Sequence, residues 1–323
     1  MAVTAVSLFS GCGGFDLGAK RAGVCVLWAN DINRHAAATY QKYLPEVEFR
    51  LGDIRTIEKC VIPQADLLIG CYPCQGFSAA AWRRWRTRDQ RDLFANVDNF
   101  LFLEFVKAIP YVKPKFVFIE NVQGLRSSAQ GWFFQAQKEV LEKAGYTVFN
   151  TRLNTKHYGL AQSRNRIFIV GVEKSLPYRY SFPDPTHGPD YLYPYQSQKK
   201  VIGHLPPWPA GEFEDIPFHG HYLTRNRKKP WDSYSYTIVA HSHHVCLHPM
   251  GESMLKVGKD QWILRGSTNR RFSWRECALL QTFDEEFEPD GPLSAKYAQV
   301  GNAVPPSIGK LIVQPAVRFL EAQ

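Results

Sequence analysis

The chain has 323 residues, with 39 Lys and Arg against 30 Asp and Glu, which gives a formal net charge of +9 at pH 7. Hydrophobic residues make up 45% and charged residues 21%, as in soluble globular proteins that bury a sizeable core. No apolar run approaches the ~20 residues of a membrane-spanning helix. The positive charge favours a polyanionic partner, although a merely basic soluble enzyme fits it equally well.

The first half of the chain alternates strand and helix patterns. Strands are predicted at Val3–Phe9, Val24–Asn30, Phe49–Leu51, Asp66–Ile69, Phe116–Ile119, Thr147–Leu153 and Ile167–Gly171. Helices are predicted at Asp16–Ala22, Arg34–Tyr43, Phe133–Ala144, Ser273–Gln281 and Pro306–Leu320. Strands that alternate with helices predict an α/β fold with a doubly wound, mostly parallel sheet.

The composition of the chain changes after about residue 171. Residues 172–270 are rich in Pro, Tyr, Trp, His and Gly and show few helical patterns, which is typical of loops and short strands. We therefore predict a larger domain at residues 1–173, completed by residues 292–323. A smaller, irregular domain is predicted at residues 174–291.

Seven cysteines are scattered along the chain. Their odd number and the ordinary hydrophobicity argue for free thiols in a reducing compartment. The first residues lack the basic leader of a secretory signal, so we expect no signal peptide and a cytoplasmic location.

Cys74 is the first candidate for chemistry. It follows the predicted strand Asp66–Ile69, with Pro73 before it and the turn-forming pair Gln75-Gly76 after it. In open α/β sheets, ligands and chemistry gather beyond the carboxyl ends of the strands. A thiol in that place is a candidate nucleophile.

A second interpretation of the same run is a metal or redox site. Cys71 and Cys74 form a Cys-x-x-Cys pair, which suits a redox dithiol or half of a zinc site. Further ligands would come from His241, His243, His244, Cys246 and His248. The sequence has no second Cys-x-x-Cys, and we therefore expect no metal.

A glycine-rich turn at residues 9–15 follows the first predicted strand. Such a turn lets a nucleotide-like ligand approach the backbone, although a tight turn without a ligand also explains it. Asp31 follows the second strand, where a carboxylate can accept hydrogen bonds from ribose hydroxyls. Asp53 follows the third strand and can contact an adenine amine. Suitable groups at three strand ends in order predict an adenosine site.

Glu120 stands at the end of a very apolar strand. Desolvation there favours the protonated carboxyl and hence a proton-donating role, while the alternative is a cap for the next helix. Arg164 and Arg166 alternate just before the strand Ile167–Gly171, which predicts that both guanidinium groups lie on one face. They suit a base carbonyl, a carboxylate or phosphates, or are ordinary surface charges.

Taken together, these motifs resemble the DNA cytosine-5 methyltransferase family of bacterial and phage restriction-modification systems. The resemblance runs from about residue 7 to residue 308, with a poorly similar stretch where that family carries its target recognition domain. It rests on the ordered motifs Phe9–Gly14, Pro73–Gln75, Glu120–Val122, Gln162–Arg166, Arg275–Gln281 and Gln299–Pro306, and on Tyr236–Ile238. Two positions depart from the family pattern: Tyr72 replaces a second proline, and Ser7 replaces an acid.

The resemblance implies an S-adenosylmethionine-dependent methyltransferase fold and a role for each matching residue. Cys74 would attack C6 of a cytosine flipped out of the duplex, and Glu120 would hold and protonate N3. Arg166 would contact the base O2, with Arg164 in support. The residues implied to bind S-adenosylmethionine, with S-adenosylhomocysteine as product, are Phe9, Gly11, Cys12, Gly14, Asp31, Ile32, Asp53, Ile54, Leu93, Asn302 and Val304.

The family resemblance also implies double-stranded DNA as the partner. The basic run Trp82–Arg91 is expected to contact phosphates and to insert a side chain into the duplex, while the alternative is a solvated helix face. The DNA-contacting residues would be Arg83, Arg84, Arg86, Arg88 and Thr237, with a second patch at Arg225, Arg227, Lys228 and Lys229. We expect a monomer, with a cognate restriction endonuclease as a candidate partner.

The nearest alternative within the family is a methyltransferase of transfer RNA. The Cys-Phe-Thr signature of that branch is absent from the recognition region, which favours DNA.

Overall fold

The structure is a computed structural model that describes residues 2–73 and 93–323, and it divides into two compact units. The first unit contains Met1–Leu153, Asn165–Pro183 and Gly309–Gln323, and the second contains Asn154–Arg164 and Asp184–Ile308. This division differs from the predicted boundaries at residues 154–164, 174–183 and 292–308.

Local contacts explain where the division falls. The Tyr180 hydroxyl donates to the carbonyl of Ile312 at 2.6 Å, which ties residues 174–183 to the end of the chain within the first unit. In the second unit, Tyr297 donates to the carbonyl of Phe272 at 2.5 Å. Residues 292–308 therefore stay with that unit.

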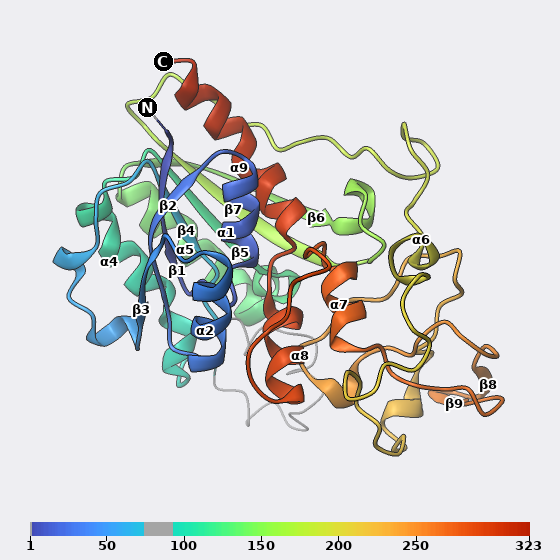
Figure 1. Cartoon of the computed structure of the whole chain (residues 1–323). Coiled ribbons are helices and arrows are strands. Elements are labelled where there is room, and N and C mark those ends of the chain that lie inside the picture. Colours follow the sequence, from blue (N-terminus) through green and yellow to red (C-terminus); the bar gives the residue numbers. More distant parts are fainter. Residues whose placement is uncertain (1, 74–92) are drawn as a thin grey trace. The chain divides into compact units, whose positions relative to one another are not determined.

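A seven-stranded sheet forms the centre of the first unit, in the order β3-β2-β1-β4-β5-β7-β6 (Figure 1). Strands β1 to β5 pair in parallel and β7 pairs antiparallel with β5, so the predicted α/β fold with a mostly parallel sheet is confirmed. The strands are β1 (Thr4–Leu8), β2 (Cys25–Asp31), β3 (Glu48–Leu51), β4 (Leu67–Gly70), β5 (Phe116–Val122), β6 (Tyr146–Asn154) and β7 (Asn165–Glu173).

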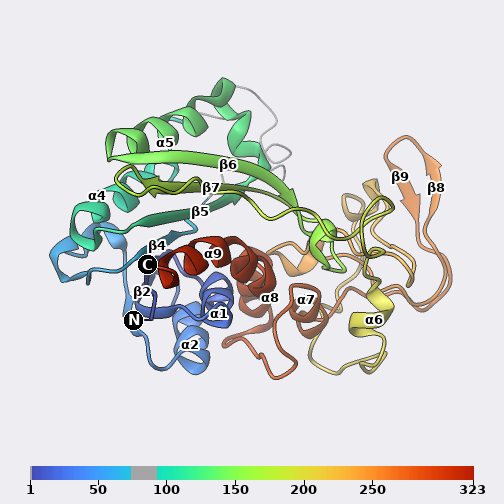
Figure 2. The same ribbon diagram turned by 90° about the horizontal axis from the view of Figure 1, so that it is seen from above.

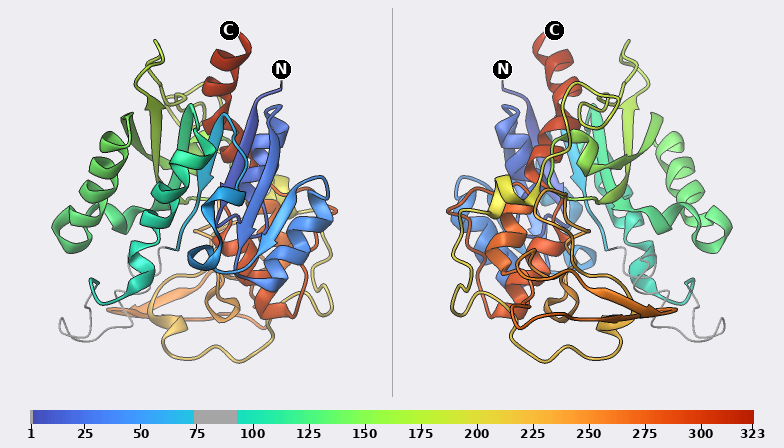
Figure 3. Two further views of the ribbon diagram at one scale, coloured as in Figure 1. Left: turned by 90° about the vertical axis from the view of Figure 1, so that its left-hand side faces the viewer. Right: turned by 90° about the vertical axis from the view of Figure 1, so that its right-hand side faces the viewer.

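Helices cover both faces of this sheet. Figure 2 shows α1 (Gly14–Arg21), α2 (Arg34–Tyr43) and α9 (Pro306–Glu321) on one face, and α4 (Phe102–Val112) and α5 (Trp132–Lys143) on the other. The same layers are seen in Figure 3. Because both faces are covered, β4 is buried along its whole length.

The second unit has little regular structure, as its composition predicts. It contains the hairpin β8 (Leu255–Gly258) and β9 (Gln261–Ile263) and the helices α6 (Gln198–Ile202), α7 (Trp274–Leu280) and α8 (Leu293–Asn302). Buried ionic and amide contacts, described below, support it.

Short 3₁₀ helices connect the elements of both units. They are Ile54–Thr56, Lys59–Val61, Val97–Phe100, Gln123–Arg126, Ser128–Gly131, Thr155–Tyr158, Tyr222–Thr224 and Ser242–His244. None of the helices in the described residues has the length and apolar character needed to cross a lipid bilayer.

Candidate functional site

The sheet register places several predicted site residues in one row at its carboxyl edge. Leu8 of β1 pairs with Asn30 of β2 and with Gly70 of β4. Gly70 in turn pairs with Ile119 of β5. The next residue along each parallel strand is Phe9, Asp31, Cys71 and Glu120, respectively. These four positions therefore share the edge where α/β folds bind ligands.

The glycine-rich turn after β1 has a backbone shaped for close approach. Phe9, Gly11 and Gly13 have φ of 57°, 56° and 85°, in the left-handed region that favours glycine. The amide of Gly11 donates to Oδ2 of Asp31 at 2.8 Å, which fixes the turn to the end of β2. A side chain built at Gly11 would meet no atom of residues 2–73 and 93–323 within 4 Å, so these residues leave the space over the turn open.

Backbone amides hold the carboxylate of Asp31 in place, and its oxygens can accept further hydrogen bonds. Its Oδ1 accepts from the amide of Asn33 at 2.8 Å, and burial raises the pKa of the carboxyl. Next to it, the Ile32 side chain is 67% exposed, an unusual position for a large apolar group at a strand end. An acceptor beside an exposed apolar surface suits a ribose and an adjoining base.

Other residues of the predicted cofactor set have supporting positions. Cys12 is buried, and burial raises the pKa of its thiol to about 12, so it packs as a neutral group. Gly14 begins α1. Leu93 is partly buried against the core, and its carbonyl accepts from the side chain of Asn99 at 2.8 Å.

Asp53 is already engaged in the described structure. It caps a 3₁₀ turn by accepting from the amide of Arg55, and its Oδ2 lies 2.6 Å from the Arg55 guanidinium. Hydrogen bonds from Arg55 lower the pKa of this carboxyl. The side chain of Ile54 is 2% exposed and belongs to the core.

Glu120 and Arg166 form an ion pair at the end of β5. Glu120 is opposite Phe168 of β7, and Arg166 lies two residues earlier, on the same face of the sheet. Nε of Arg166 is 2.7 Å from Oε1 of Glu120, and both side chains are mostly buried. The pair fixes the position of the carboxyl at this edge of the sheet.

Arg164 has different partners from Arg166 although only one residue separates them. Its guanidinium, 1% exposed, donates to the carbonyls of Ile238, Gly301 and Ala303 at 3.0–3.1 Å. Arg164 therefore stabilises loops inside the second unit. These contacts differ from the prediction that both guanidinium groups lie on one face of a strand. Arg164 precedes β7, so the alternation of side chains along that strand does not determine its direction.

The predicted DNA-contacting Thr237 lies on the same buried framework. Its hydroxyl donates to the carbonyl of Ser163 at 2.7 Å. The amide of Ile238 donates to Gln162, whose side chain in turn donates to Gln281. In the same unit, Asn302 is the exposed last residue of α8, and Val304 is buried.

Part of the second predicted phosphate patch is wrong. Arg227 and Lys228 are 3% and 5% exposed. Arg227 donates to the carbonyls of Tyr222 and His244, and Lys228 donates to two carbonyls and to Asn269. These cations stabilise protein loops and present little charge to solvent.

Cys74 and the four arginines of the basic run, Arg83, Arg84, Arg86 and Arg88, lie outside the described residues.

Tyr72 is a residue whose importance the sequence did not reveal. Its hydroxyl donates to Oε1 of the buried Gln137 at 2.6 Å. Its ring contacts Phe9, Phe102 and Phe105. The tyrosine therefore anchors the segment before Cys74 by packing, where the resembling family has a proline.

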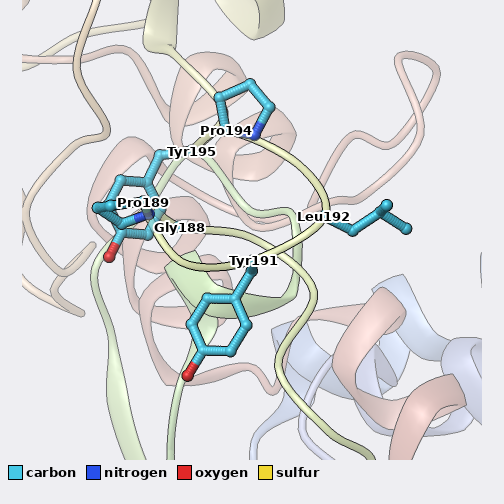
Figure 4. A pocket seen from close by; sticks show the side chains of 6 residues that line it. All are labelled: Gly188, Pro189, Tyr191, Leu192, Pro194 and Tyr195. Carbon is cyan, nitrogen blue, oxygen red and sulfur yellow. The ribbon is translucent and has the colours of Figure 1, made fainter.

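Two surface pockets were measured, and neither is lined by the residues of this sheet edge. One of about 340 Å³ is lined by Gly188, Pro189, Tyr191, Leu192, Pro194 and Tyr195 (Figure 4). The other, of about 510 Å³, is lined by Arg126, Ala129, Gln130, Gly131, Trp132, Phe134 and Gln135. Among residues 2–73 and 93–323, no group of three or more His, Cys, Asp or Glu side chains is arranged to hold a metal ion.

Comparison with known families shows which family the chain belongs to. Residues 3–317 match the model of the C-5 cytosine-specific DNA methylases. The chain belongs to this family. It is a DNA methylase that modifies C5 of cytosine, and members of the family use S-adenosylmethionine.

Individual relatives agree with this assignment. The type II methyltransferase M.BsuRI of Bacillus subtilis is 33% identical over 370 residues, with 99% of this chain and 81% of the relative covered. M.BspRI of Lysinibacillus sphaericus is 34% identical, with 97% and 81% covered. The structure of the Entamoeba histolytica methyltransferase EhMeth has the same fold, with a TM-score of 0.74 at 18% identity, covering 100% of this chain and 99% of that one.

Proposed function

We propose that this methylase modifies one short DNA sequence through a covalent adduct between Cys74 and C6 of the target cytosine. The observation that carries the proposal is that one sheet edge holds Phe9, Asp31, Cys71 and Glu120. Cys71 stands three residues before the proposed nucleophile, Cys74, in the sequence. The match to the DNA methylase family supports DNA over transfer RNA as the substrate.

The residues at the turn after β1 fit S-adenosylmethionine. The open space at Gly11 accepts a ligand against the backbone, and Asp31 supplies a carboxylate for ribose hydroxyls. Ile32 offers an exposed apolar side chain for the adenine. Phe9, Cys12, Gly14, Asp53, Ile54, Leu93, Asn302 and Val304 complete the proposed set. The bound molecule would supply an electrophilic methyl group.

Cys74 and Glu120 divide the chemistry on the cytosine. C5 of cytosine is a poor nucleophile, and addition of the Cys74 thiolate to C6 makes it electron-rich. Glu120 delivers a proton to N3, which neutralises the charge that develops on the ring. After C5 gains its methyl group, loss of the C5 proton restores the double bond and expels the thiolate of Cys74.

Arg166 positions Glu120 for this reaction. The ion pair at 2.7 Å orients the carboxyl, and the same guanidinium can donate to O2 of the base. The proposed role of Cys74 requires its thiolate form, which positive charge close to a thiol favours. Arg164 acts indirectly, by fixing loops of the second unit.

The two units divide catalysis and sequence recognition in this proposal. The first unit carries the cofactor and the reacting groups, and the second reads the target sequence in double-stranded DNA, with Thr237 at the backbone. The basic run at Arg83, Arg84, Arg86 and Arg88 binds phosphates. The enzyme acts as a monomer in the bacterial cytoplasm. Its type II relatives favour a restriction endonuclease partner.

A methylation map of DNA from a host without its own cytosine methylation tests this proposal. The host expresses the chain or its Cys74→Ser variant, and 5-methylcytosine is located at base resolution. Methylation confined to one short motif, and lost in the variant, is the expected result. An unmethylated genome despite folded, soluble protein would contradict the proposal, as would an active Cys74→Ser variant.

A further inference from the structure

Five of the ten histidines of the chain gather in one place in the second unit. Neighbouring rings have centroids 5.0–6.2 Å apart. We call this group the histidine cluster; it consists of His219, His221, His241, His243 and His244. Three members, His219, His221 and His241, are exposed. The cluster is therefore a surface feature that a ligand can reach.

Two buried arginines hold the loops that carry the cluster. Arg227 donates to the carbonyls of Tyr222 and His244, and Arg271 donates to the carbonyls of His243, Glu214 and Ile216. Both guanidinium groups stack on the ring of Tyr222, with centroid distances of 4.5 and 5.0 Å. The cluster is thus built on a fixed framework that contains buried positive charge.

One of these arginines has unused hydrogen-bonding capacity. Arg271 is 1% exposed, and its Nη2 has no hydrogen-bond partner among the described residues. A buried guanidinium N–H that lacks an acceptor costs free energy unless an anion or another acceptor approaches. This buried guanidinium adds positive charge to the framework that carries the cluster.

The remaining charges near the cluster are few. Glu214 lies 3.6 Å from Nε2 of His243 and accepts from Ser242, while Asp215 acts on Arg271 at longer range. Arg225, Arg227 and Arg271 all act electrostatically on Tyr222, and Arg271 also interacts with the two carboxylates. Tyr222, Cys246 and Tyr297 are neutral, because burial raises the pKa of each.

We propose that the histidine cluster is a phosphate-binding surface for the DNA backbone and that it takes up protons when DNA binds. This inference rests on the proposed function, because it requires a DNA substrate. It adds a binding surface, and a dependence on proton concentration, that the methyl-transfer reaction itself does not require.

The physical basis is the mutual repulsion of closely spaced imidazolium groups. Burial, with His241 and Arg227, lowers the pKa of His244 to about 4, and burial with His221 and Arg271 lowers the pKa of His219. His219 and His244 are therefore neutral in the free protein at neutral pH. A phosphate close to the rings favours the protonated forms and raises their pKa values in the complex.

The sign of the pH dependence follows from this difference. A base whose pKa is higher in the complex than in the free protein strengthens binding below its free pKa, and the gain is lost as the pH rises through its pKa in the complex. DNA affinity should thus increase as the pH falls from about 8 to about 5, the range in which histidines titrate. Each proton taken up contributes at most about tenfold in Kd per pH unit.

The test measures the Kd of the full-length chain for a short fluorescent DNA duplex across this pH range, by fluorescence anisotropy. Ionic strength is held constant, and a chelator prevents metal ions from bridging the histidines. The test variant replaces two exposed members together, His221→Gln and His241→Gln. The matched control is His204→Gln, an exposed histidine of the same unit that pairs with Glu285 outside the cluster.

We expect the wild type and the His204→Gln control to bind more tightly as the pH falls, and the double variant to show a clearly smaller slope. Equal slopes in the double variant and the wild type would overturn the inference, provided that circular dichroism shows both to be folded. The single variants serve if the double variant does not fold. Absence of DNA binding at every pH would instead overturn the proposed function.

Discussion

Replacement of Arg270 by Met should strongly destabilise the second unit. The Arg270 guanidinium donates to both carboxylate oxygens of Glu276 at 2.7 Å, and each side chain is 1% exposed. It also donates to the carbonyl of Pro207 at 2.6 Å. Arg270→Met leaves the Glu276 carboxylate buried without its cation. Burial already raises the pKa of Glu276, so the uncompensated charge is costly.

The expected loss is about 3–5 kcal/mol in the free energy of unfolding, the usual cost of breaking a buried ion pair from one side. The matched control is Arg265→Met, because Arg265 pairs with Glu252 on the surface, where the side chains are 47% and 52% exposed. An exposed pair contributes about 0–1 kcal/mol. Urea unfolding followed by circular dichroism measures both, with separate fits if the two units unfold in separate transitions.

A double variant, Arg270→Met with Glu276→Met, separates the two causes. If the cost comes from an unpaired buried charge, the double variant should recover most of the stability that Arg270→Met loses. The reasoning would be refuted if Arg270→Met and Arg265→Met lost the same small amount. It would also be refuted if the double variant were much less stable than Arg270→Met alone.

Three further predictions concern single residues. Tyr72→Phe leaves Oε1 of the buried Gln137 without its donor and should cost about 1–3 kcal/mol in the same unfolding assay, and an unchanged midpoint would contradict this. His248 is buried as a neutral imidazole, and burial with Arg270 lowers its pKa to about 3. Its contribution to stability should therefore be complete above about pH 6.5 and decline as the pH falls towards 3; an NMR titration of its ring near pH 6.5 would disprove this. Glu120→Gln should lower kcat by about 10²–10⁴-fold while DNA binding persists, and full activity would exclude Glu120 as the proton donor.

Much of the first unit could be predicted from the sequence because its strands are short, apolar and bounded by turns. The helix α4 was missed, since Phe102–Val112 contains Pro110 and is apolar on most sides, which obscures the helical period. The helix α8 was also missed. Its sequence carries no clear helix signal, and its last turn contains Gly301 and Asn302, which are poor helix formers.

The sequence predicts the positions of site residues that lie at strand ends. It does not predict the positions of residues that tertiary contacts determine. Asp31 is the last residue of β2 and Glu120 lies near the end of β5, and the register brings both to one edge of the sheet. By contrast, Arg227 and Lys228 look like surface charges in the sequence, and only the fold shows that carbonyls of distant loops surround them. The role of Tyr72 likewise depends on Gln137, 65 residues away in the chain.

The central claim, that Cys74 forms a covalent bond to C6, can be tested most directly by trapping that bond. The duplex carries the motif found in the methylation map, with 5-fluorocytosine at the target position. The C5 fluorine cannot leave as a proton does, so the adduct should persist. We predict a denaturation-resistant complex whose peptide mass spectrum places the DNA on Cys74, and none with Cys74→Ser. An adduct on Cys71, or no adduct from an enzyme that methylates ordinary DNA, would contradict the account.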